Sequence, residues 1–293
     1  MIDLHAHTTA SDGSDTPAEL IVNAVAAGLH TLAITDHDTT GGWDDASAAV
    51  RELHVPFTLI RGAEFSCVHE QDGARISLHL LGYLFDPEAE ALKSERARLR
   101  ANRLGRGEAI VNGMVAAGYP ISWQQVVEIA DGGAVGRPHI GQALLQAGVV
   151  DSVTAAFAEL LSSSSPYYVP KMDMPALLAI ELIRQSGGVP VIAHPWARKR
   201  GRILPESALR SLVAAGLLGI EVDHVDHGTA DRAELARLAA ELDVFSTGSS
   251  DYHGTRKAVR LGAETTTQAS LQRLLGLASG IGPVHSKTAR HPV

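Results

Sequence analysis

Residues 2–38, IDLHAHTTASDGSDTPAELIVNAVAAGLHTLAITDHD, begin with a short apolar run, continue into a helical pattern and end in a second apolar run. The pattern predicts a strand that ends at His5 and a second strand over 30–38. Thr16 is the expected N-cap of the helix between them, and Pro17 fits its first turn. A strand, a helix and another strand in this order indicate a parallel sheet with helices packed on it.

Strands and helices alternate along most of the remaining chain. Further helices are predicted over 44–53, 175–188, 205–216 and 229–242, and further strands over 55–68, 74–85, 189–195, 218–224 and 244–254. Residues 88–174 carry only helical and loop signals. Because a barrel is the natural closure of a parallel sheet at this length, we expect a discontinuous barrel domain over 1–87 and 175–282. Residues 88–174 would form an inserted helical cap domain, and 283–293 a poorly ordered tail.

The composition narrows the class of protein. Of the 293 residues, 45% are hydrophobic and 20% are charged, which is enough to bury a large core. The net charge of −8 lacks the basic footprint of a surface that binds duplex DNA. The single cysteine, Cys67, excludes an internal disulfide framework and fits a reducing compartment. With no evident signal peptide and no apolar run of about 18 residues, we expect a cytoplasmic protein without a membrane span.

Potential metal ligands follow nearly every predicted strand. They are His5, His7, Asp36, His37, Asp38, Glu64, His79, His194, Glu221, His224, Asp251 and His253. In a parallel barrel the carboxyl ends of the strands share one face, where active sites are built. A single histidine at a strand end is usually structural, but seven consecutive strand ends with the same residue types indicate a metal site. Imidazole and carboxylate together suit Zn, Mn or Fe, and more than four ligands indicate two or three ions bridged by a carboxylate.

Seven short motifs resemble those of the PHP (polymerase and histidinol phosphatase) family of metal-dependent phosphoesterases. They are DLHAHTTASDG (3–13), LAITDHDT (32–39), GAEFS (62–66), HLLGY (79–83), IAHP (192–195), GIEV (219–222) and GSSDYHG (248–254). The resemblance implies a distorted seven-stranded (β/α) barrel of the TIM type. VGRPHIGQALLQAG and YYVPK look like the branch with an inserted helical domain. That branch acts on nucleotides and includes 3′,5′-nucleotide bisphosphate phosphatases and 5′-to-3′ exonucleases of short RNA.

The resemblance also implies three metal positions. The first would be held by His5, His7, Glu64 and Asp251, the second by Glu64, His79 and His194, and the third by Asp12, His37 and His253. Two to three divalent ions are expected, Mn²⁺ in the first place, with Zn²⁺ or Fe²⁺ as alternatives. Some relatives have histidine where this chain has Asp12. The carboxylate of Asp12 would shift the metal preference of the third position.

Two neighbouring ions can hold a hydroxide at neutral pH for in-line attack on phosphorus, while a third offsets charge on the phosphoryl oxygens. We therefore predict hydrolysis of a phosphate monoester without a phosphoenzyme. The best candidate is the 3′-phosphate of nucleoside 3′,5′-bisphosphates, with short 5′-phosphorylated RNA as a further substrate. The sequence shows no nucleophile elbow, Cys–His pair or P-loop.

A phosphorylated substrate also needs cations. Arg137 and His139 in GRPHI and Lys171 in VPK lie at the edges of the insertion, where they are expected to contact substrate phosphate. Arg137 is also expected to act in catalysis. Arg103 lies in a helix of mixed charge and is a weaker candidate for the same role; an ordinary surface position is the alternative for all four.

Other residues beside the predicted ligands have two interpretations. His227 is expected either to protonate the leaving group or to be structural. Asp36 and Asp38 flank His37, and each is expected to orient a metal-binding imidazole. The basic stretch 197–202, ARKRGR, either binds a second phosphate or forms a plain loop.

Two rival functions and one rival chemistry remain. A phosphatase of a small metabolite such as histidinol phosphate is opposed by the nucleotide-type insertion. A non-catalytic, metal-stabilised module is opposed by the complete ligand set. An amidohydrolase of C–N bonds usually needs a carboxylated lysine, and no lysine ends a predicted strand. The sequence leaves the oligomeric state open.

Overall fold

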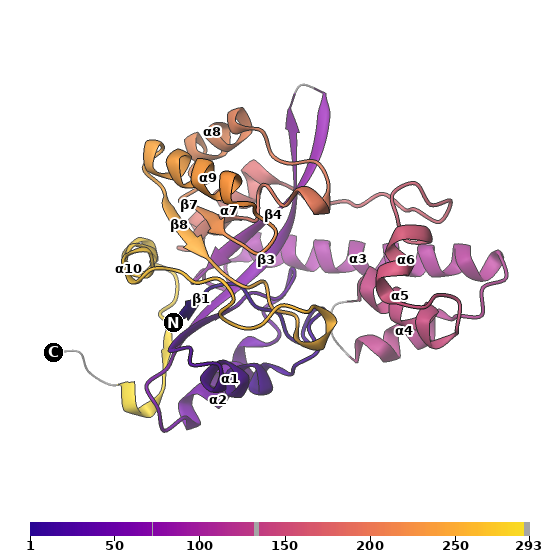
Figure 1. Cartoon of the computed structure of the whole chain (residues 1–293), viewed down its shortest axis with the longest axis horizontal. Coiled ribbons are helices and arrows are strands. Elements are labelled where there is room, and N and C mark those ends of the chain that lie inside the picture. The colour runs from indigo at the N-terminus through magenta and orange to yellow at the C-terminus, as the bar shows by residue number, and fades with distance from the viewer. Residues whose placement is uncertain (72, 132–134, 290–293) are drawn as a thin grey trace.

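A nine-stranded sheet organises the molecule, and seven of its strands form the continuous path of the barrel (Figure 1). The computed structural model describes residues 1–71, 73–131 and 135–289. The strands of this path, in their order across the sheet, are β1 (Ile2–Asp3), β2 (Thr31–Ile34), β3 (Thr58–Gln71), β4 (Ala74–Tyr83), β6 (Val189–Ala193), β7 (Gly219–Asp223) and β8 (Phe245–Gly248). Past the ends of β1 and β8, Ala6 forms a parallel bridge with Tyr252, and the His7 N–H donates to the Tyr252 carbonyl at 2.9 Å. The expected distorted α/β barrel is confirmed.

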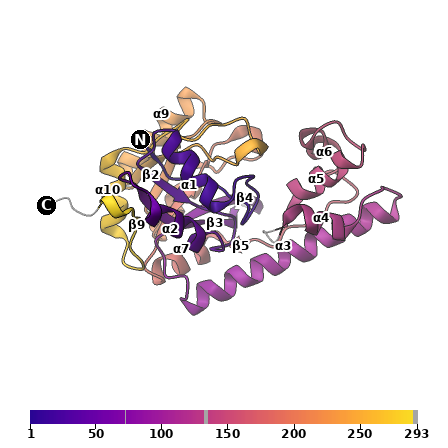
Figure 2. The same ribbon diagram turned by 90° about the horizontal axis from the view of Figure 1, so that it is seen from below.

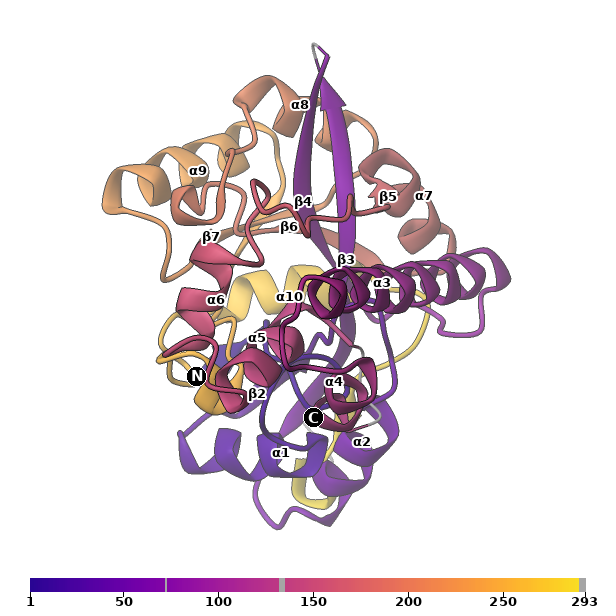
Figure 3. The same ribbon diagram turned by 90° about the vertical axis from the view of Figure 1, so that its right-hand side faces the viewer.

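The strand β4 corrects the expectation of an all-parallel sheet. It runs antiparallel to both β3 and β6. Gln71 pairs with Ala74, and a connection this short allows only a hairpin, since parallel strands need a long crossover. The hairpin projects well beyond the barrel (Figures 1 and 3). Glu64 and His79 consequently lie within strands, so the expectation that they end strands is wrong.

Six helices flank the barrel. They are α1 (Pro17–Ala26), α2 (Trp43–Glu52), α7 (Ala176–Gln185), α8 (Glu206–Ala214), α9 (Thr229–Glu241) and α10 (Gln268–Leu277). The predicted cap of α1 is confirmed. The Glu19 N–H donates to Thr16 Oγ1 at 3.2 Å, and the Thr16 N–H donates to Glu19 Oε2 at 2.8 Å. This reciprocal capping box satisfies two amide groups that the helix itself leaves unpaired.

Four helices lie between β4 and the short strand β5 (Met174–Pro175). They are α3 (Glu90–Ala116), α4 (Trp123–Ala130), α5 (Arg137–Gln146) and α6 (Val153–Glu159). Ile110, Met114 and Leu144 belong to an apolar cluster separate from that of the barrel. Leu92 and Leu99, at the start of α3, instead pack in the barrel cluster. Figure 2 shows α3 running from the barrel to the other three helices. The domain boundaries at 87/88 and 174/175 stay predictions.

The chain beyond residue 283 does not match the expected poorly ordered tail. Strand β9 (Val284–His285) pairs antiparallel with β3, and the Phe57 N–H donates to Ser286 Oγ at 3.0 Å. The expectation is therefore wrong for residues 284–289, while 290–293 lie outside the described residues. Within the described ranges, no helix is both long and apolar enough to cross a membrane.

Candidate metal centre

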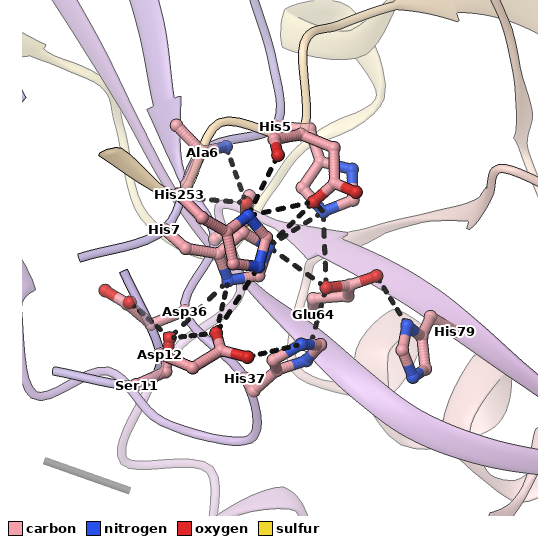
Figure 4. A network of polar contacts seen from close by, with 12 residues as sticks. His5, Ala6, His7, Ser11, Asp12, Asp36, His37, Glu64, His79 and His253 are labelled. Atoms are coloured by element: carbon pink, nitrogen blue, oxygen red, sulfur yellow. Dashed lines mark hydrogen bonds and ion pairs between the residues drawn. The ribbon is translucent and has the colours of Figure 1, made fainter. Parts of the chain in front are cut away.

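All of the residues predicted as metal ligands come together at the mouth of the barrel, and Figure 4 shows most of them from close by. The set is His5, His7, Asp12, His37, Glu64, His79, His194, Asp251 and His253. Each lies within hydrogen-bond or ion-pair distance of another member. Most are carried by loops that follow β1, β2, β6 and β8, whereas Glu64 and His79 project from the middle of the β3–β4 hairpin.

The first predicted position has four side chains around one point. Nε2 of His5 and Nε2 of His7 lie 3.2 and 3.1 Å from Glu64 Oε2, and 3.5 and 3.4 Å from Asp251 Oδ1. The two Nε2 atoms are only 3.1 Å apart. Nδ1 of His5 lies 3.0 Å from Glu221 Oε1, a contact that places the His5 proton on Nδ1 and the lone pair on Nε2. Two imidazole nitrogens and two carboxylate oxygens that converge in this way fit a divalent cation.

The second predicted position uses the other oxygen of Glu64. Oε1 lies 2.7 Å from His79 Nδ1 and 3.0 Å from His194 Nε2. His37 also approaches this carboxylate, with Nδ1 3.2 Å from Oε2, and this nitrogen is buried without a hydrogen-bond partner among the described residues. Because its two oxygens face different groups of imidazoles, Glu64 has the geometry of a bridging carboxylate.

The third predicted position centres on Asp12. Oδ1 lies 3.4 Å from His253 Nε2 and 3.7 Å from His7 Nδ1, and Oδ2 lies 3.8 Å from His37 Nε2. Burial lowers the pKa of His253 to about 3, so its ring is neutral and offers a lone pair. His7, assigned from the motifs to the first position alone, thus turns one nitrogen toward each of two positions.

Glu221, listed among the potential ligands but assigned to none of the three metal positions, supports the candidate ligands from outside the centre. It is fully buried. Oε1 accepts from His5 Nδ1 at 3.0 Å and also from the Ser249 hydroxyl, while Oε2 accepts from the His194 N–H at 2.7 Å. A carboxylate that fixes the tautomer of a metal-binding histidine also fixes the direction of its lone pair. The signal in the sequence was the GIEV motif, which places Glu221 on a strand beside that of the ligand His194.

Asp36 and Asp38 have partners other than the predicted one. Asp36 accepts from the Thr8 N–H at 2.7 Å, from Thr8 Oγ1 at 2.7 Å and from Ser11 Oγ at 2.6 Å. It therefore holds the loop that carries Asp12. Asp38 accepts from the Ser66 N–H at 2.8 Å and pairs with Arg103 at 2.5 Å. Neither makes a hydrogen bond to an imidazole of the candidate ligands among the described contacts, so these contacts do not support the predicted orienting role.

A cavity of about 190 Å³ lies against the centre, and we call it the first chamber. It borders Asp12, His37 and His79, and Arg103, Arg106, Arg137 and Lys171 contribute to its walls. Two of these cations already have acidic partners. Nη2 of Arg103 lies 2.5 Å from Asp38 Oδ2, and Nζ of Lys171 lies 3.0 Å from Asp173 Oδ1.

The two remaining histidine candidates lie outside the residues that line this chamber. His139 is buried at the start of α5, where Nδ1 accepts from the Gly136 N–H at 3.0 Å and Nε2 lies 2.8 Å from Arg256 Nη1. In His227, Nδ1 donates to the Val222 carbonyl at 2.8 Å and Nε2 accepts from the Trp196 N–H at 3.2 Å. Both nitrogens of His227 are occupied, so this arrangement does not favour proton donation to a leaving group.

Known proteins share both the sequence and the fold. The PHP domain family matches residues 3–130. A 5′-3′ exoribonuclease, Rnm, from Salmonella typhimurium is 33% identical over 275 residues, which cover 92% of this chain and 91% of that protein. A 3′,5′-nucleoside bisphosphate phosphatase from Chromobacterium violaceum is 33% identical over 86% of this chain and 87% of its own. A solved structure from Bifidobacterium adolescentis, described as a metal-dependent phosphoesterase, is 36% identical with a TM-score of 0.89 and covers 95% of this chain and 96% of its own.

The fold, the centre and these relatives define a metal-dependent, phosphoester-hydrolysing enzyme. The chain belongs to the PHP family.

Proposed function

We propose that this enzyme hydrolyses a phosphate monoester of a nucleotide, and that its main substrate is the 3′-phosphate of nucleoside 3′,5′-bisphosphates. The proposal depends mainly on one observation: a small chamber with arginine and lysine side chains in its walls borders the candidate metal centre. The nucleoside bisphosphate phosphatase among the relatives supports the substrate class. The exoribonuclease relatives make short 5′-phosphorylated RNA a second candidate substrate.

Three divalent ions, with Mn²⁺ as the first choice, would be held by the three groups of side chains that meet at Glu64 and Asp12. When bound, such ions lower the pKa of water so that it attacks phosphorus at neutral pH, and they offset negative charge on the phosphoryl oxygens. Glu64 joins the first two positions, and His7 joins the first to the third. Because neighbouring metal positions share a ligand in this proposal, the protein fixes the distance between the ions.

The side chains of the chamber wall bind and orient the substrate. Arg137 presents a planar guanidinium suited to two phosphate oxygens, and Lys171 supplies a point charge. Arg137 is held in place by donation from Nη1 to the Leu161 carbonyl at 2.9 Å and by its position over the Phe157 ring, 5.3 Å from the ring centre. Arg103 reaches the same chamber but is paired with Asp38, and His139 supports the start of α5. Substrate contact by these two residues stays a prediction.

A phosphate-release screen with Mn²⁺ tests the function. Adenosine 3′,5′-bisphosphate should give the highest kcat/KM, ahead of adenosine 5′-monophosphate, histidinol phosphate and a short 5′-phosphorylated RNA. His5→Ala should lose this activity, because it removes one of the four ligand atoms at the first position. A clear preference for histidinol phosphate would contradict the nucleotide assignment. Because an exonuclease frees mononucleotides and no inorganic phosphate, cleavage of the RNA is followed by chromatography of the released mononucleotides, and a higher kcat/KM for that release would make the exonuclease reaction the main one.

A further inference from the structure

A second chamber of about 480 Å³ lies next to the first. His79, Arg106, Arg137 and Lys171 line both chambers, and we call these four residues the seam. The second chamber also borders His194, whose Nε2 lies 3.0 Å from Glu64 Oε1. A phosphate held at the metal centre therefore has one chamber on each side of the seam into which the rest of its molecule can extend.

The two arginines of the seam carry positive charge that is not matched by acidic side chains among the described residues, whereas Lys171 is paired with Asp173. Nε of Arg106 donates to the Val169 carbonyl at 2.7 Å, and Arg137 Nη1 donates to the Leu161 carbonyl. Within the part of the chain that the structure describes, neither arginine forms an ion pair with a carboxylate. Burial lowers the pKa of Arg106, and the neighbouring charge of Arg137 lowers it further. Two partly buried guanidinium groups that repel each other favour the binding of an anion between them.

The walls of the second chamber differ from those of the first. Leu78, Pro195 and Leu204 contribute apolar surface, and no aspartate or glutamate is among the described residues that line it. Tyr168 is 39% exposed and lines the same chamber. The Arg106 guanidinium lies over its ring, 5.7 Å from the ring centre. An exposed aromatic ring beside unpaired arginines is the combination on which nucleobases stack in binding sites for single-stranded nucleic acid.

The volumes of the two chambers indicate which part of the substrate each one can hold. The first, of about 190 Å³, is below the range of about 300–1,000 Å³ that is usual for complete small-molecule sites, and the second lies within it. We infer that the second chamber binds the nucleoside of the substrate, with its base against Tyr168, and that Arg106 at the seam holds the phosphate that is not cleaved. This inference rests on the proposed function, and it defines the enzyme as specific for an ester that carries both a base and a second anionic group.

Two substrates separate this role from general catalysis. Phosphate release from adenosine 3′,5′-bisphosphate is compared with release from glycerol 2-phosphate, which has neither base nor second phosphate. Arg106→Gln should lower kcat/KM for the bisphosphate roughly 10- to 100-fold, and by at least tenfold more than for glycerol 2-phosphate. Tyr168→Ala should raise KM for the bisphosphate roughly tenfold, and Tyr168→Phe should restore it because the ring is kept.

Two further variants make the result independent of folding at Arg106 and Tyr168. Ser77→Trp places a large side chain at an exposed strand position that lines only the second chamber, and it should raise KM for the bisphosphate selectively. Arg100→Gln, an exposed arginine of α3 outside the residues that line either chamber, should behave like the wild type. Equal losses on both substrates in Arg106→Gln, Tyr168→Ala and Ser77→Trp would overturn the inference.

Binding of adenosine 5′-monophosphate, measured by calorimetry on the metal-loaded enzyme, separates the inference from the proposed function. If the wild type releases phosphate from some other ester and not from the bisphosphate, the proposed function fails. Weaker binding of this nucleotide to Arg106→Gln and Tyr168→Ala would still support the second chamber as a nucleotide site, and unchanged binding would overturn it.

Discussion

The candidate metal centre and the arginine seam meet at His79, yet they are built differently. The centre consists mostly of buried side chains on strands and loops, and the residues around them make several contacts: Glu221 alone accepts from His5, His194 and Ser249. Arg106 and Arg137 instead extend from helices of the insertion and bond mainly to backbone carbonyls. Several contacts thus hold the side chains of the centre in place, whereas the seam has cationic side chains that are available to bind a ligand.

The helix α3 joins the two regions. Its first half packs in the barrel cluster through Leu92 and Leu99, and Arg96 Nη1 donates to Thr40 Oγ1 at 2.7 Å. Its second half packs in the insertion cluster through Ile110 and Met114. Arg103 and Arg106 lie between these halves. A single rigid helix therefore sets the distance between the chemistry and the residues that hold the substrate, and the two regions should respond separately to substitution.

The largest effect is expected at the bridging carboxylate. Glu64→Gln removes the charge that faces His5, His7, His79 and His194, so metal binding should weaken at two positions together. Changes to outer residues of metal sites typically cost about 10- to 100-fold, and loss of this ligand should exceed that range in kcat/KM. Metal content after dialysis and phosphate release measure it. Glu70→Gln, an exposed glutamate of the same strand, is the matched control, and wild-type activity of Glu64→Gln would show that the centre lies elsewhere.

Two substitutions in α3 separate the regions. Leu99 and Ile110 are both 3% exposed, and either one changed to alanine should lower the free energy of unfolding by about 2–5 kcal/mol. Leu99→Ala loosens the barrel and should weaken metal binding. Ile110→Ala loosens the insertion and should raise KM for the nucleotide with little change in metal affinity. Urea unfolding, KM and metal content report the three quantities. Equal loss of metal affinity in both variants would contradict the separation between a metal-binding region and a substrate-binding region.

A smaller effect is expected outside the ligand set. Glu221→Gln keeps the size of the side chain but weakens the contact that fixes the proton of His5 on Nδ1. We expect a loss of about 10- to 100-fold in metal affinity, with KM for substrate nearly unchanged at saturating Mn²⁺. Titration with Mn²⁺ under steady-state conditions measures both quantities. A change in KM without a change in metal affinity would show that Glu221 acts in substrate binding and not in metal binding.

The smallest effect is expected from pH at the start of α5. Burial lowers the pKa of His139 from its ordinary 6.5 to about 4. Between these values the unfolded chain binds a proton that the folded chain does not, so stability falls as the pH drops from 6.5 toward 4. At pH 5 this loss is about 2 kcal/mol. His139→Gln keeps an acceptor for the Gly136 N–H and should remove that part of the pH dependence. Urea unfolding at pH 8 and pH 5 compares the two proteins, and an unchanged difference between pH values would refute the assignment.

The sequence predicted which residues gather at the candidate centre better than it predicted how they are arranged there. The predicted ligands lie together in the candidate centre. Most of them follow or interrupt an apolar strand pattern that is read locally, and Asp12 was placed by the family resemblance. The reversal of β4 was missed, since a barrel was assumed to be parallel throughout. The sequence also did not single out the right arginine of α3 as the one that faces both chambers. Arg103, the weaker candidate for substrate contact, lines the first chamber and is paired with Asp38, whereas Arg106, given no role, lines both. Residues three apart on a helix share a face, so only the neighbouring elements could distinguish them.

The sequence by itself determined the alternation of strands and helices, the helical character of the insertion and the set of candidate ligand residues. These features depend on local periodicity and on the chemistry of individual side chains. Only the tertiary structure decided which oxygen of Glu64 meets which imidazole, that His7 faces two candidate positions and that the seam arginines lack acidic partners among the described residues. Such facts depend on distances between residues far apart in the chain, and those distances are set by the packing of the hairpin, α3 and the barrel together.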